Sequence, residues 1–502
     1  MNVARILDGH DAGSIALISR NRETSYGDLR SQVERVRGGL VGQGVSKGDR
    51  VVILCGNNRH FVVSYLAIVG CGAIAIPLNP DSPGPEIARE LAVVRPRAVI
   101  VGPAAVAAWA TLVGPVQDSI ATVVIAEAAP GPGVLSFDDL LAAQPLPAVD
   151  VDPDHVAVMM FTSGTAGEPR AAMLSHGNLL ANLSQSLSAR DHCRAGDIVY
   201  GVLPLFHIYG LNVVVGGSLS VGATALLVQR FDPATAVQSI VQRGVTMVPG
   251  APPMWAAFSH FDELPSDTFQ TVRIAASGAS RLSPKVSERM LSMFDLVLSE
   301  GYGLTEAAPV VTSSVGFESR VGSVGRALAG VEIRVVDHGG ADVPVGDSGE
   351  IWVRGDNVFL GYFEDQEATD RVLVDGWLRT GDLGVVDDDG YLYLVDRIKD
   401  LIIVSGFNVF PGEVEEVLLQ HPAVAEVGVL GVPHPHDGEA VKAYVVLREG
   451  ADVDEESLIR YSADYLARYK CPTKVIFTDA LPRNASGKLI RRELEGTVIG
   501  PT

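Results

Sequence analysis

The chain has 502 residues, enough to bury a large core and to divide into more than one domain. Apolar residues make up 47% and charged residues 20%, which is ordinary for a globular protein. The 60 acidic side chains outnumber the 39 basic ones and give a formal net charge of −21, which argues against general nucleic-acid binding. An anionic ligand must therefore be held by local cations.

The cysteines and the N-terminus bear on the compartment. The four cysteines lie far apart without a CxxC pair, so they predict neither a disulfide framework nor a zinc site and fit a reducing cytosol. The first residues contain no apolar signal core. Residues 198–229 contain no Asp, Glu, Lys or Arg, but Pro204 and several glycines interrupt them. We predict a buried helix and strand there, and a cytoplasmic protein.

The N-terminal part of the chain alternates between strand-like and helical patterns. We expect strands over 50–55, 73–78 and 98–101, helices over 61–71 and 88–94, and the same rhythm between 200 and 274. Repeated strand–helix–strand units predict parallel sheets that are covered by helices. Residues 130–147, the nearest approach to low complexity, are expected to form a surface connection.

The pattern changes near residue 325 to short strands with Gly and Asp-Gly turns, which predicts a β-rich subdomain over 325–396. Beyond it, strand-like and helical runs alternate in a segment of the size of a small α+β domain. These C-terminal runs are 427–432 and 443–447 (strands) and 413–419 and 457–469 (helices). The predicted fold class is α/β, with a large N-terminal domain over 1–396 and a small C-terminal domain over 397–502.

The most informative motif is residues 162–176, which directly follow an apolar run. It combines hydroxyls, glycines and a cation: Thr162, Ser163, Gly164, Thr165, Gly167 and Arg170. Glycines let backbone N–H groups turn toward oxygens, hydroxyls donate further bonds, and the cation offsets charge. No Gly-Lys-Ser/Thr closes the motif, so it is not a Walker loop. The pattern predicts a strand that delivers a loop to a polyphosphate; an ordinary Gly/Ser turn is the alternative.

Two further motifs offer ligand groups. Residues 300–306 place glycines on both sides of Tyr302, so the backbone can pass close to a ligand while the ring offers a stacking face. Glu306 is a hard oxygen ligand that suits Mg²⁺. In residues 377–383, Asp382 follows a glycine turn and can accept from two ribose hydroxyls, with a structural Asx turn as the alternative.

The last two motifs lie near the C-terminus, at residues 397–408 and 482–488. Basic residues gather between Arg468 and Arg492, which is unusual in an acidic chain. A solvated helix end would explain them, but the Gly-Lys pair that ends at Lys488 indicates a mobile cation brought to an anion.

Together, and in this order, the motifs resemble those of the acyl-adenylate-forming superfamily, which includes acyl-CoA synthetases, luciferases and peptide-synthetase adenylation domains. The resemblance runs from about residue 24 to Glu493, and residues 204–210, 248–253 and 396–408 look most like fatty acyl-CoA synthetases. It implies a large N-terminal domain and a small mobile C-terminal domain that swings about a hinge.

The resemblance also implies a ligase reaction in two steps. A carboxylate, here a fatty acid, attacks the α-phosphorus of Mg·ATP and displaces pyrophosphate, and the thiol of coenzyme A then attacks the acyl-AMP and releases AMP. ATP, Mg²⁺ and coenzyme A are the implied cofactors. Like-charge repulsion between a carboxylate and a triphosphate requires cations and hydroxyl donors at the site.

By matching motifs, the resemblance assigns roles to single residues. Thr162, Ser163, Gly164, Thr165, Gly167 and Arg170 would hold the β- and γ-phosphates; Thr305 would contact the α-phosphate and Glu306 the magnesium; Ser277, Gly278, Ala279, Ser280 and Tyr302 would hold adenine; Asp382 and Arg397 would bind ribose. Lys488 would bridge the attacking carboxylate and the α-phosphate, Lys399 would be the hinge, Ser405, Gly406 and Phe407 would line the pantetheine tunnel, and His207 would lie at the acyl pocket. A hydrogen-bonded core histidine is the alternative for His207.

The phosphate loop departs from the usual motif at three positions: Ala166 replaces threonine, Arg170 replaces lysine and Ala171 replaces glycine. Arginine keeps the charge, Ala171 is expected to stiffen a mobile loop, and one lost hydroxyl costs about 1 kcal/mol. We expect slower turnover or altered nucleotide affinity. Gly216, Gly217 and Gly250 are weak indications of space for a long acyl tail.

Several alternatives stay open. A fatty acyl-AMP ligase would hand the acyl group to an acyl carrier protein, although its usual inserted segment finds no room between the tightly spaced motifs. Amino-acid adenylation needs a carboxylate for the substrate ammonium, and residues 206–215 contain none. A catalytically weakened nucleotide-binding homologue is supported only by the altered loop. Acyl chain length, membrane association and oligomeric state are undetermined.

Overall fold

The computed structural model describes residues 1–112, 120–126, 133–163, 169–261, 263–397, 400–404, 407–434, 438–484 and 488–497. The chain divides into two compact units: unit 1 is Met1–Glu332 with Val353–Leu378, and unit 2 is Ile333–Trp352 with Arg379–Thr502. The domain boundary that the sequence places after residue 396 stays a prediction.

Unit 1 contains an eight-stranded sheet in the order β19-β9-β8-β4-β3-β5-β6-β7. Its strands are β3 (Arg50–Leu54), β4 (Ile74–Pro77), β5 (Ala98–Val101), β6 (Thr122–Ile125), β7 (Leu135–Ser136), β8 (Val156–Ser163), β9 (Pro169–Ser175) and β19 (Gly361–Tyr362). The strands from β8 to β7 run parallel, whereas β9 is antiparallel to both β8 and β19. The central strands β4 and β5 are fully buried, and β3 is buried except at Arg50, as expected for a sheet with helices on both faces.

A second sheet of unit 1 follows the order β16-β15-β14-β13-β12-β10-β11-β1-β2. The strands are β1 (Ile15–Ser19), β2 (Arg22–Ser25), β10 (Ile198–Gly201), β11 (Thr224–Leu227), β12 (Met247–Gly250), β13 (Ile274–Ser277), β14 (Leu298–Gly303), β15 (Val310–Ser313) and β16 (Ser323–Ala327). Strands from β1 to β14 are parallel, and β15 turns back on β14. The carboxyl ends of β12, β13 and β14 therefore lie side by side.

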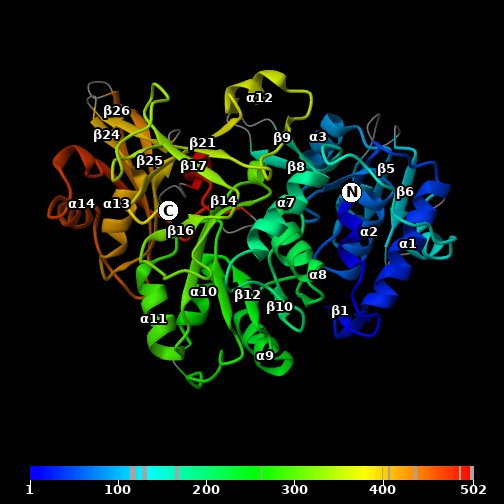
Figure 1. The fold of residues 1–502 in the computed structure, drawn as a ribbon. Coiled ribbons are helices and arrows are strands. Elements are labelled where there is room, and N and C mark those ends of the chain that lie inside the picture. The colour runs from blue at the N-terminus through cyan, green and yellow to red at the C-terminus, as the bar shows by residue number, and fades with distance from the viewer. Residues whose placement is uncertain are drawn as a thin grey trace. The chain divides into compact units, whose positions relative to one another are not determined.

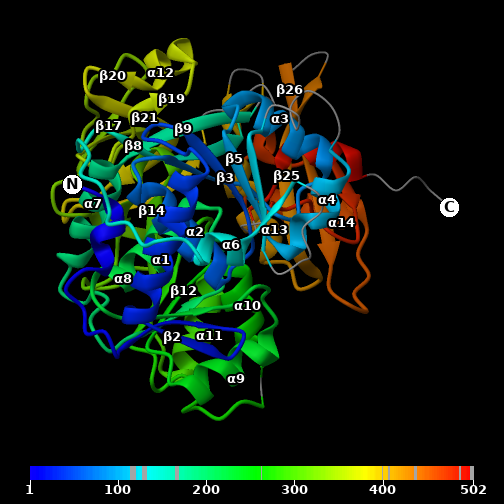
Figure 2. The same ribbon diagram turned by 90° about the vertical axis from the view of Figure 1, so that its right-hand side faces the viewer.

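Helices of unit 1 cover these sheets (Figures 1 and 2). They are α1 (Tyr26–Gly42), α2 (Arg59–Gly70), α3 (Gly84–Val94), α4 (Val106–Ala110), α6 (Phe137–Leu141), α7 (His176–Leu187), α8 (Gly217–Ser220), α9 (Pro233–Arg243), α10 (Pro252–Ser259), α11 (Pro284–Phe294) and α12 (Gln366–Val372), with 3₁₀ turns η1 (Val3–Leu7), η2 (Pro103–Ala105) and η4 (Thr305–Ala307) and the π-helix η3 (Tyr209–Gly216). Ser25, Asn58 and Ser175 cap α1, α2 and α7, because each side chain accepts an otherwise unpaired N–H of the first turn. The expected strand–helix alternation is confirmed.

The charge-free stretch forms β10, η3, α8 and β11 in the core of unit 1, as predicted. None of the helices in the described ranges is long and apolar enough to cross a membrane. The expectation for residues 130–147 is wrong in part, because β7 and α6 occupy their middle. Phe137 and Leu140 are buried, and Leu140 packs where a side chain on Gly39 of α1 would stand.

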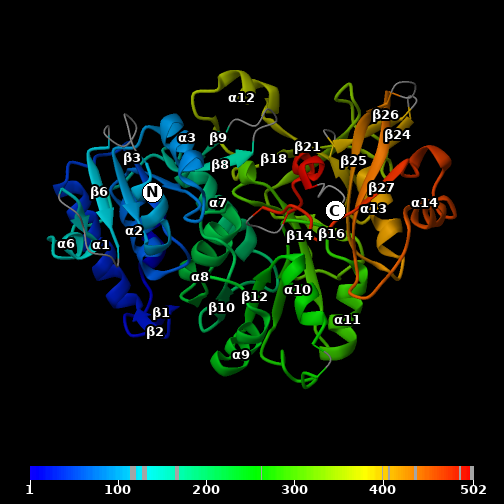
Figure 3. The same cartoon turned by 180° about the vertical axis from the view of Figure 1, so that it is seen from behind.

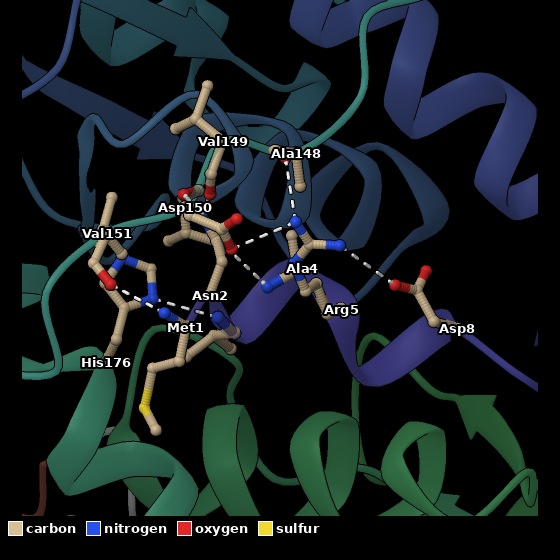
Figure 4. Close-up of polar contacts among 12 residues, drawn as sticks. Met1, Asn2, Ala4, Arg5, Asp8, Ala148, Val149, Asp150, Val151 and His176 are labelled. Atoms are coloured by element: carbon tan, nitrogen blue, oxygen red, sulfur yellow. Dashed lines mark hydrogen bonds and ion pairs between the residues drawn. The ribbon is translucent and has the colours of Figure 1, made fainter.

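The N-terminal segment is tied into unit 1 by polar contacts (Figure 4). The Asn2 side chain donates to the carbonyls of Val69 and Val149, at 2.9 Å each. The Val3 N–H donates to Nδ1 of His176, also at 2.9 Å. Burial lowers the pKa of His176 to about 3, so this ring stays neutral and accepts. His176 therefore has a structural role at the start of α7.

Unit 2 holds most of the predicted β-rich subdomain together with the C-terminal segment. Its strands are β17 (Glu332–Val336), β18 (Gly349–Arg354), β21 (Trp377–Val386), β22 (Tyr391–Arg397), β23 (Ile402–Val404), β24 (Phe407–Val409), β25 (Val424–His434), β26 (Gly438–Leu447) and β27 (Lys474–Phe477); β20 (Leu373–Val374) pairs with the start of β21. Helices α13 (Pro411–Leu419) and α14 (Glu455–Ala463) and the turns η6 (Arg468–Lys470) and η7 (Arg491–Thr497) complete it. The predicted helix over 457–469 ends earlier, at Ala463.

Candidate active site

The predicted phosphate loop begins and ends in a β-hairpin. Strands β8 and β9 pair in antiparallel register, with Thr162 opposite Arg170 and Ser163 opposite Pro169. The paired strands bring the two ends of the loop together. The apolar run had predicted the strand before the loop, which is confirmed, but not the returning strand β9. Gly164, Thr165 and Gly167, as well as Ala166, lie outside the described residues, as does the side chain of Ser163. Their phosphate-binding roles stay predictions.

The expected effect of Ala171 on the loop is wrong. Ala171 lies within β9, opposite Phe161, and is 1% exposed. It therefore belongs to the apolar core and not to a mobile loop. Arg170 is also a strand residue, and its Nε donates to Oδ2 of Asp365 at 2.9 Å. Part of its charge is therefore committed to a carboxylate of the same unit.

Glu306 lies in the 3₁₀ turn η4, just after β14. The Tyr362 hydroxyl donates to its Oε1 at 2.7 Å, and the Phe359 N–H donates to its backbone carbonyl at 2.9 Å. Burial, and then the nearby Glu306 carboxylate, raise the pKa of Tyr362, so the phenol keeps its proton. The Glu306 carboxylate is therefore held by a neutral donor.

The donor set at Glu306 suits magnesium bound together with a nucleotide. Within the described ranges there is no cluster of three or more His, Cys, Asp or Glu side chains that could hold a metal by itself. Mg²⁺ is usually held by one or two carboxylates together with substrate phosphates, so a single carboxylate with one oxygen left for a ligand fits the ion. Glu306 would hold the magnesium, which would offset charge on the phosphates.

The predicted adenine-binding residues lie at the carboxyl ends of β13 and β14. Ser277 Oγ is buried and has no hydrogen-bond partner within the part of the chain that the structure describes. Ala279 takes a left-handed φ of 73°, and the Tyr209 ring packs 3.1 Å from where a side chain on Gly278 would begin. An unsatisfied buried hydroxyl is costly, so Ser277 is suited to a polar ligand.

Packing within unit 1 gives a reason of its own for the glycines around Tyr302, and the expected approach of a ligand stays a prediction. A side chain on Gly303 would begin 2.2 Å from the carbonyl oxygen of Pro309, and one on Gly301 would begin 3.0 Å from that of Thr312. Both contacts come from the β15 side of the β14–β15 pair, so this packing by itself requires glycine. Tyr302 is 8% exposed, and its contact with adenine stays a prediction.

His207 directly precedes the π-helix η3. Burial lowers its pKa to about 4, so the imidazole is neutral at pH 7. Its Nε2 is buried without a hydrogen-bond partner in the described ranges, and its ring lies 4.8 Å from that of Phe206. A neutral ring nitrogen is therefore available to a ligand, while the alternative of a core histidine that is hydrogen-bonded through Nδ1 stays open.

Two of the three glycines that hinted at space for a long tail, Gly216 and Gly250, are positions of close packing. The Cε atom of Met254 lies 1.9 Å from where a side chain on Gly250 would begin. A side chain on Gly216 would begin 2.8 Å from Oδ1 of Asn212. The protein's own side chains fill this space, so these glycines carry no evidence on chain length.

The predicted ribose and pantetheine residues belong to unit 2. Asp382 is 6% exposed, and its backbone pairs with that of Arg397 between β21 and β22. Phe407 is 56% exposed and stacks on Tyr469 with the ring centroids 4.8 Å apart. Lys399, Ser405 and Gly406 lie outside the described residues, as does the side chain of Arg397.

Lys488 is held by the backbone of a tight turn in unit 2. Its N–H donates to Oδ1 of Asn484 at 2.8 Å, and an isolated bridge joins Arg483 to Leu489. Three residues later, the Arg491 Nη2 donates to both oxygens of the Glu415 carboxylate at 2.8 Å. Arg491 also pairs with Asp400 at 3.3 Å. The segment that carries Lys488 is thus anchored to α13.

Sequence reasoning missed Tyr362 and Asp365. They lie almost two hundred positions beyond the phosphate loop, and nothing in the sequence pairs them with it. Their contacts arise because β19 adds to β9, with Tyr362 opposite Ala172. Figure 3 shows α12 near β9, and Asp365 caps α12 by accepting from the Ala368 N–H. The only signal was a Gly-Tyr pair ahead of a helical pattern.

Comparison with known proteins agrees with this geometry. The AMP-binding enzyme family matches residues 7–363, and its C-terminal domain matches residues 413–488. A 4-coumarate–CoA ligase of Oryza sativa subsp. japonica is 34% identical over 98% of this chain and 92% of the relative. A long-chain-fatty-acid–CoA ligase of Bacillus subtilis is 32% identical over 94% of this chain and 90% of the relative. The crystal structure of ATP-bound MatB from Rhodopseudomonas palustris superposes with a TM-score of 0.91, at 33% identity and 99% coverage of both chains.

The fold and the site define an adenylate-forming enzyme. The chain belongs to the AMP-binding enzyme family. The predicted superfamily, fold class and enzyme class are confirmed, and ATP, Mg²⁺ and coenzyme A are the cofactors that CoA ligases of this family use.

Proposed function

We infer that this enzyme is an ATP-dependent acid–CoA ligase, and we propose that its acid is a fatty acid. The acid becomes an acyl-AMP, with release of pyrophosphate, and the thiol of coenzyme A then displaces AMP. Matches to CoA ligases over nearly the whole chain carry the activity. The β8–β9 hairpin, which holds both ends of the predicted phosphate loop, and the single carboxylate of Glu306 suit the formation of acyl-AMP from ATP.

The residues near His207 support an apolar acid. The elements η3 and β11 come from a stretch without charged side chains, and most residues of η3 are buried. An acid with a charged or strongly polar tail would lose its hydration there without a charged partner. A neutral His207 imidazole can donate or accept one hydrogen bond at the carboxylate end without adding a charge.

An aromatic acid is the second candidate, because a 4-coumarate–CoA ligase is 34% identical to this chain. Both classes are apolar, so the chemistry of the stretch around His207 suits either. They differ in length and rigidity: an alkyl chain is long and flexible, whereas a flat aromatic ring requires a fixed slot.

A substrate panel tests the proposal. Purified enzyme is given ATP, Mg²⁺, coenzyme A and one acid at a time: acetate, octanoate, palmitate or 4-coumarate. We expect at least one fatty acid to give thioester and pyrophosphate. With 4-coumarate, the rate of thioester formation should be below a tenth of the rate with that fatty acid. The reverse preference would overturn the fatty-acid proposal and leave the ligase intact.

The acceptor is tested in the same assay. Hydroxylamine traps acyl-AMP as a hydroxamate, so adenylation is scored with and without coenzyme A. Hydroxamate without thioester would indicate transfer to an acyl carrier protein, and ATP binding without pyrophosphate release would indicate a weakened nucleotide-binding homologue.

We also propose a cytoplasmic location, which the four buried free thiols favour.

A further inference from the structure

Residues 359–369, in the second segment of unit 1 (Val353–Leu378), contact Glu306, the proposed magnesium ligand, at several points. Tyr362 donates to the Glu306 carboxylate, and Phe359 donates to the Glu306 backbone. The rings of Phe359 and Tyr362 pack edge to face with centroids 5.0 Å apart, and the Tyr362 N–H donates to Thr369 at 2.9 Å. The phenol is therefore fixed from several directions.

The same segment also contacts β9, the strand that follows the predicted phosphate loop. Strand β19 pairs with β9, so Tyr362 stands opposite Ala172. The Arg170 guanidinium lies 5.9 Å from the Tyr362 ring centroid and forms an ion pair with Asp365. One short segment thus connects the carboxylate of η4 with the strand that leaves the phosphate loop.

We propose that Tyr362 is a positioning residue, whose hydroxyl holds Oε1 of Glu306 so that Oε2 faces the magnesium of Mg·ATP. The inference rests on the proposed function, because it requires Glu306 to be the metal ligand. The terminal torsion of a glutamate is broad, so an unrestrained carboxylate samples many orientations. The neutral phenol of Tyr362 fixes the orientation of the Glu306 carboxylate and leaves its charge available to the ion. An arginine in place of Tyr362 would offset that charge.

The variant Tyr362→Phe removes only the hydroxyl and keeps the ring that packs on Phe359. The dissociation constant of ATP is measured by calorimetry with Mg²⁺ and again with EDTA. Loss of a group that orients a metal ligand costs about tenfold or more in metal-dependent affinity. We expect at least that loss for Mg·ATP and no change for metal-free ATP.

Two further variants complete the design. Tyr393→Phe is the matched control, because the Tyr393 hydroxyl also donates to a carboxylate, Asp387 at 3.3 Å, in unit 2. It should leave both affinities unchanged. On a Glu306→Gln background, Tyr362→Phe should have no further effect, since the metal ligand that it orients is gone.

Three results would overturn the inference. They are unchanged Mg·ATP affinity in Tyr362→Phe, an equal loss with and without Mg²⁺, and an additive loss on the Glu306→Gln background. Wild-type enzyme that binds ATP equally with and without Mg²⁺ would also overturn it. If the wild type activates no acid in the substrate panel, the proposed function fails, whereas the binding comparison still decides the role of Tyr362.

Discussion

Two glutamates, one in each unit, show how a protein separates structure from function. Glu415 on α13 accepts two bonds from Arg491 and one from the Val429 N–H at 2.9 Å. Glu306 accepts one bond from the neutral phenol of Tyr362. A carboxylate saturated by a guanidinium has no charge left for a ligand, whereas a carboxylate held by a phenol keeps it. The partner, and not the glutamate, decides the role.

The largest effect should come from breaking the saturated pair. Arg491→Met leaves Glu415, whose side chain is 16% exposed, without its cation, which should lower the free energy of unfolding of unit 2 by about 3 kcal/mol, the low end of the cost for a buried pair. Chemical denaturation, with hydrogen exchange to locate the loss, measures it. The double variant Arg491→Met with Glu415→Leu should recover most of the stability. A loss below about 1 kcal/mol would show that the pair is not a structural anchor.

Lys488 sharpens the contrast within the same C-terminal segment, because it lies three residues before the anchored Arg491. Lys488→Ala should slow acyl-AMP formation by about 10²–10³-fold, or about 3–4 kcal/mol, by removing a cation at the developing charge. Thioester formation from supplied acyl-AMP should persist. Lys474→Ala, at an exposed lysine of β27, is the control. Equal loss of both half-reactions would contradict a role confined to adenylation.

Removing the charge of Glu306 tests the second glutamate of the comparison. Glu306→Gln keeps the shape of the side chain and should slow adenylation by about 10²-fold, or about 2–3 kcal/mol, and raise the Mg²⁺ concentration for half-maximal rate. A magnesium titration of the rate measures both. Glu364→Gln, which loses only an exposed pair with Arg95, should behave like wild type. Unchanged metal dependence would rule out Glu306 as the ligand.

Glu300 is a third carboxylate with a different environment, and it should have the smallest effect. Burial raises its pKa to about 7, while the Leu282 N–H and Arg281 oppose the shift. The folded state therefore keeps this proton to a higher pH than the unfolded state does. Because of this, Glu300 makes the free energy of unfolding fall as the pH rises from about 4.5 to 7. Glu300→Gln should shrink the difference in Tm between pH 5 and pH 8 by about 2 °C. The exposed Glu288→Gln is the control, and an unchanged difference would contradict a buried, protonated Glu300.

Much of the fold could be predicted because its signals are local. The apolar run of β3 and the helical spacing of α2 each lie within a dozen residues, and the structure confirms both. The role of Ala171 could not be predicted, because a glycine-rich motif does not reveal where its loop ends and its strand begins. The packing reason for Gly303 could not be predicted either, because Pro309 approaches it through a strand pairing that no local pattern shows.

By itself, the sequence determined the order of motifs, the alternation of strands and helices, and hence the family, because these depend on neighbouring residues and their spacing. Only the tertiary structure decided which partners the charged groups have. Tyr362 reaches Glu306, and Asp365 reaches Arg170, because β19 adds to β9 from almost two hundred residues away. Strand pairing depends on the packing of the whole unit, so no local pattern encodes those contacts.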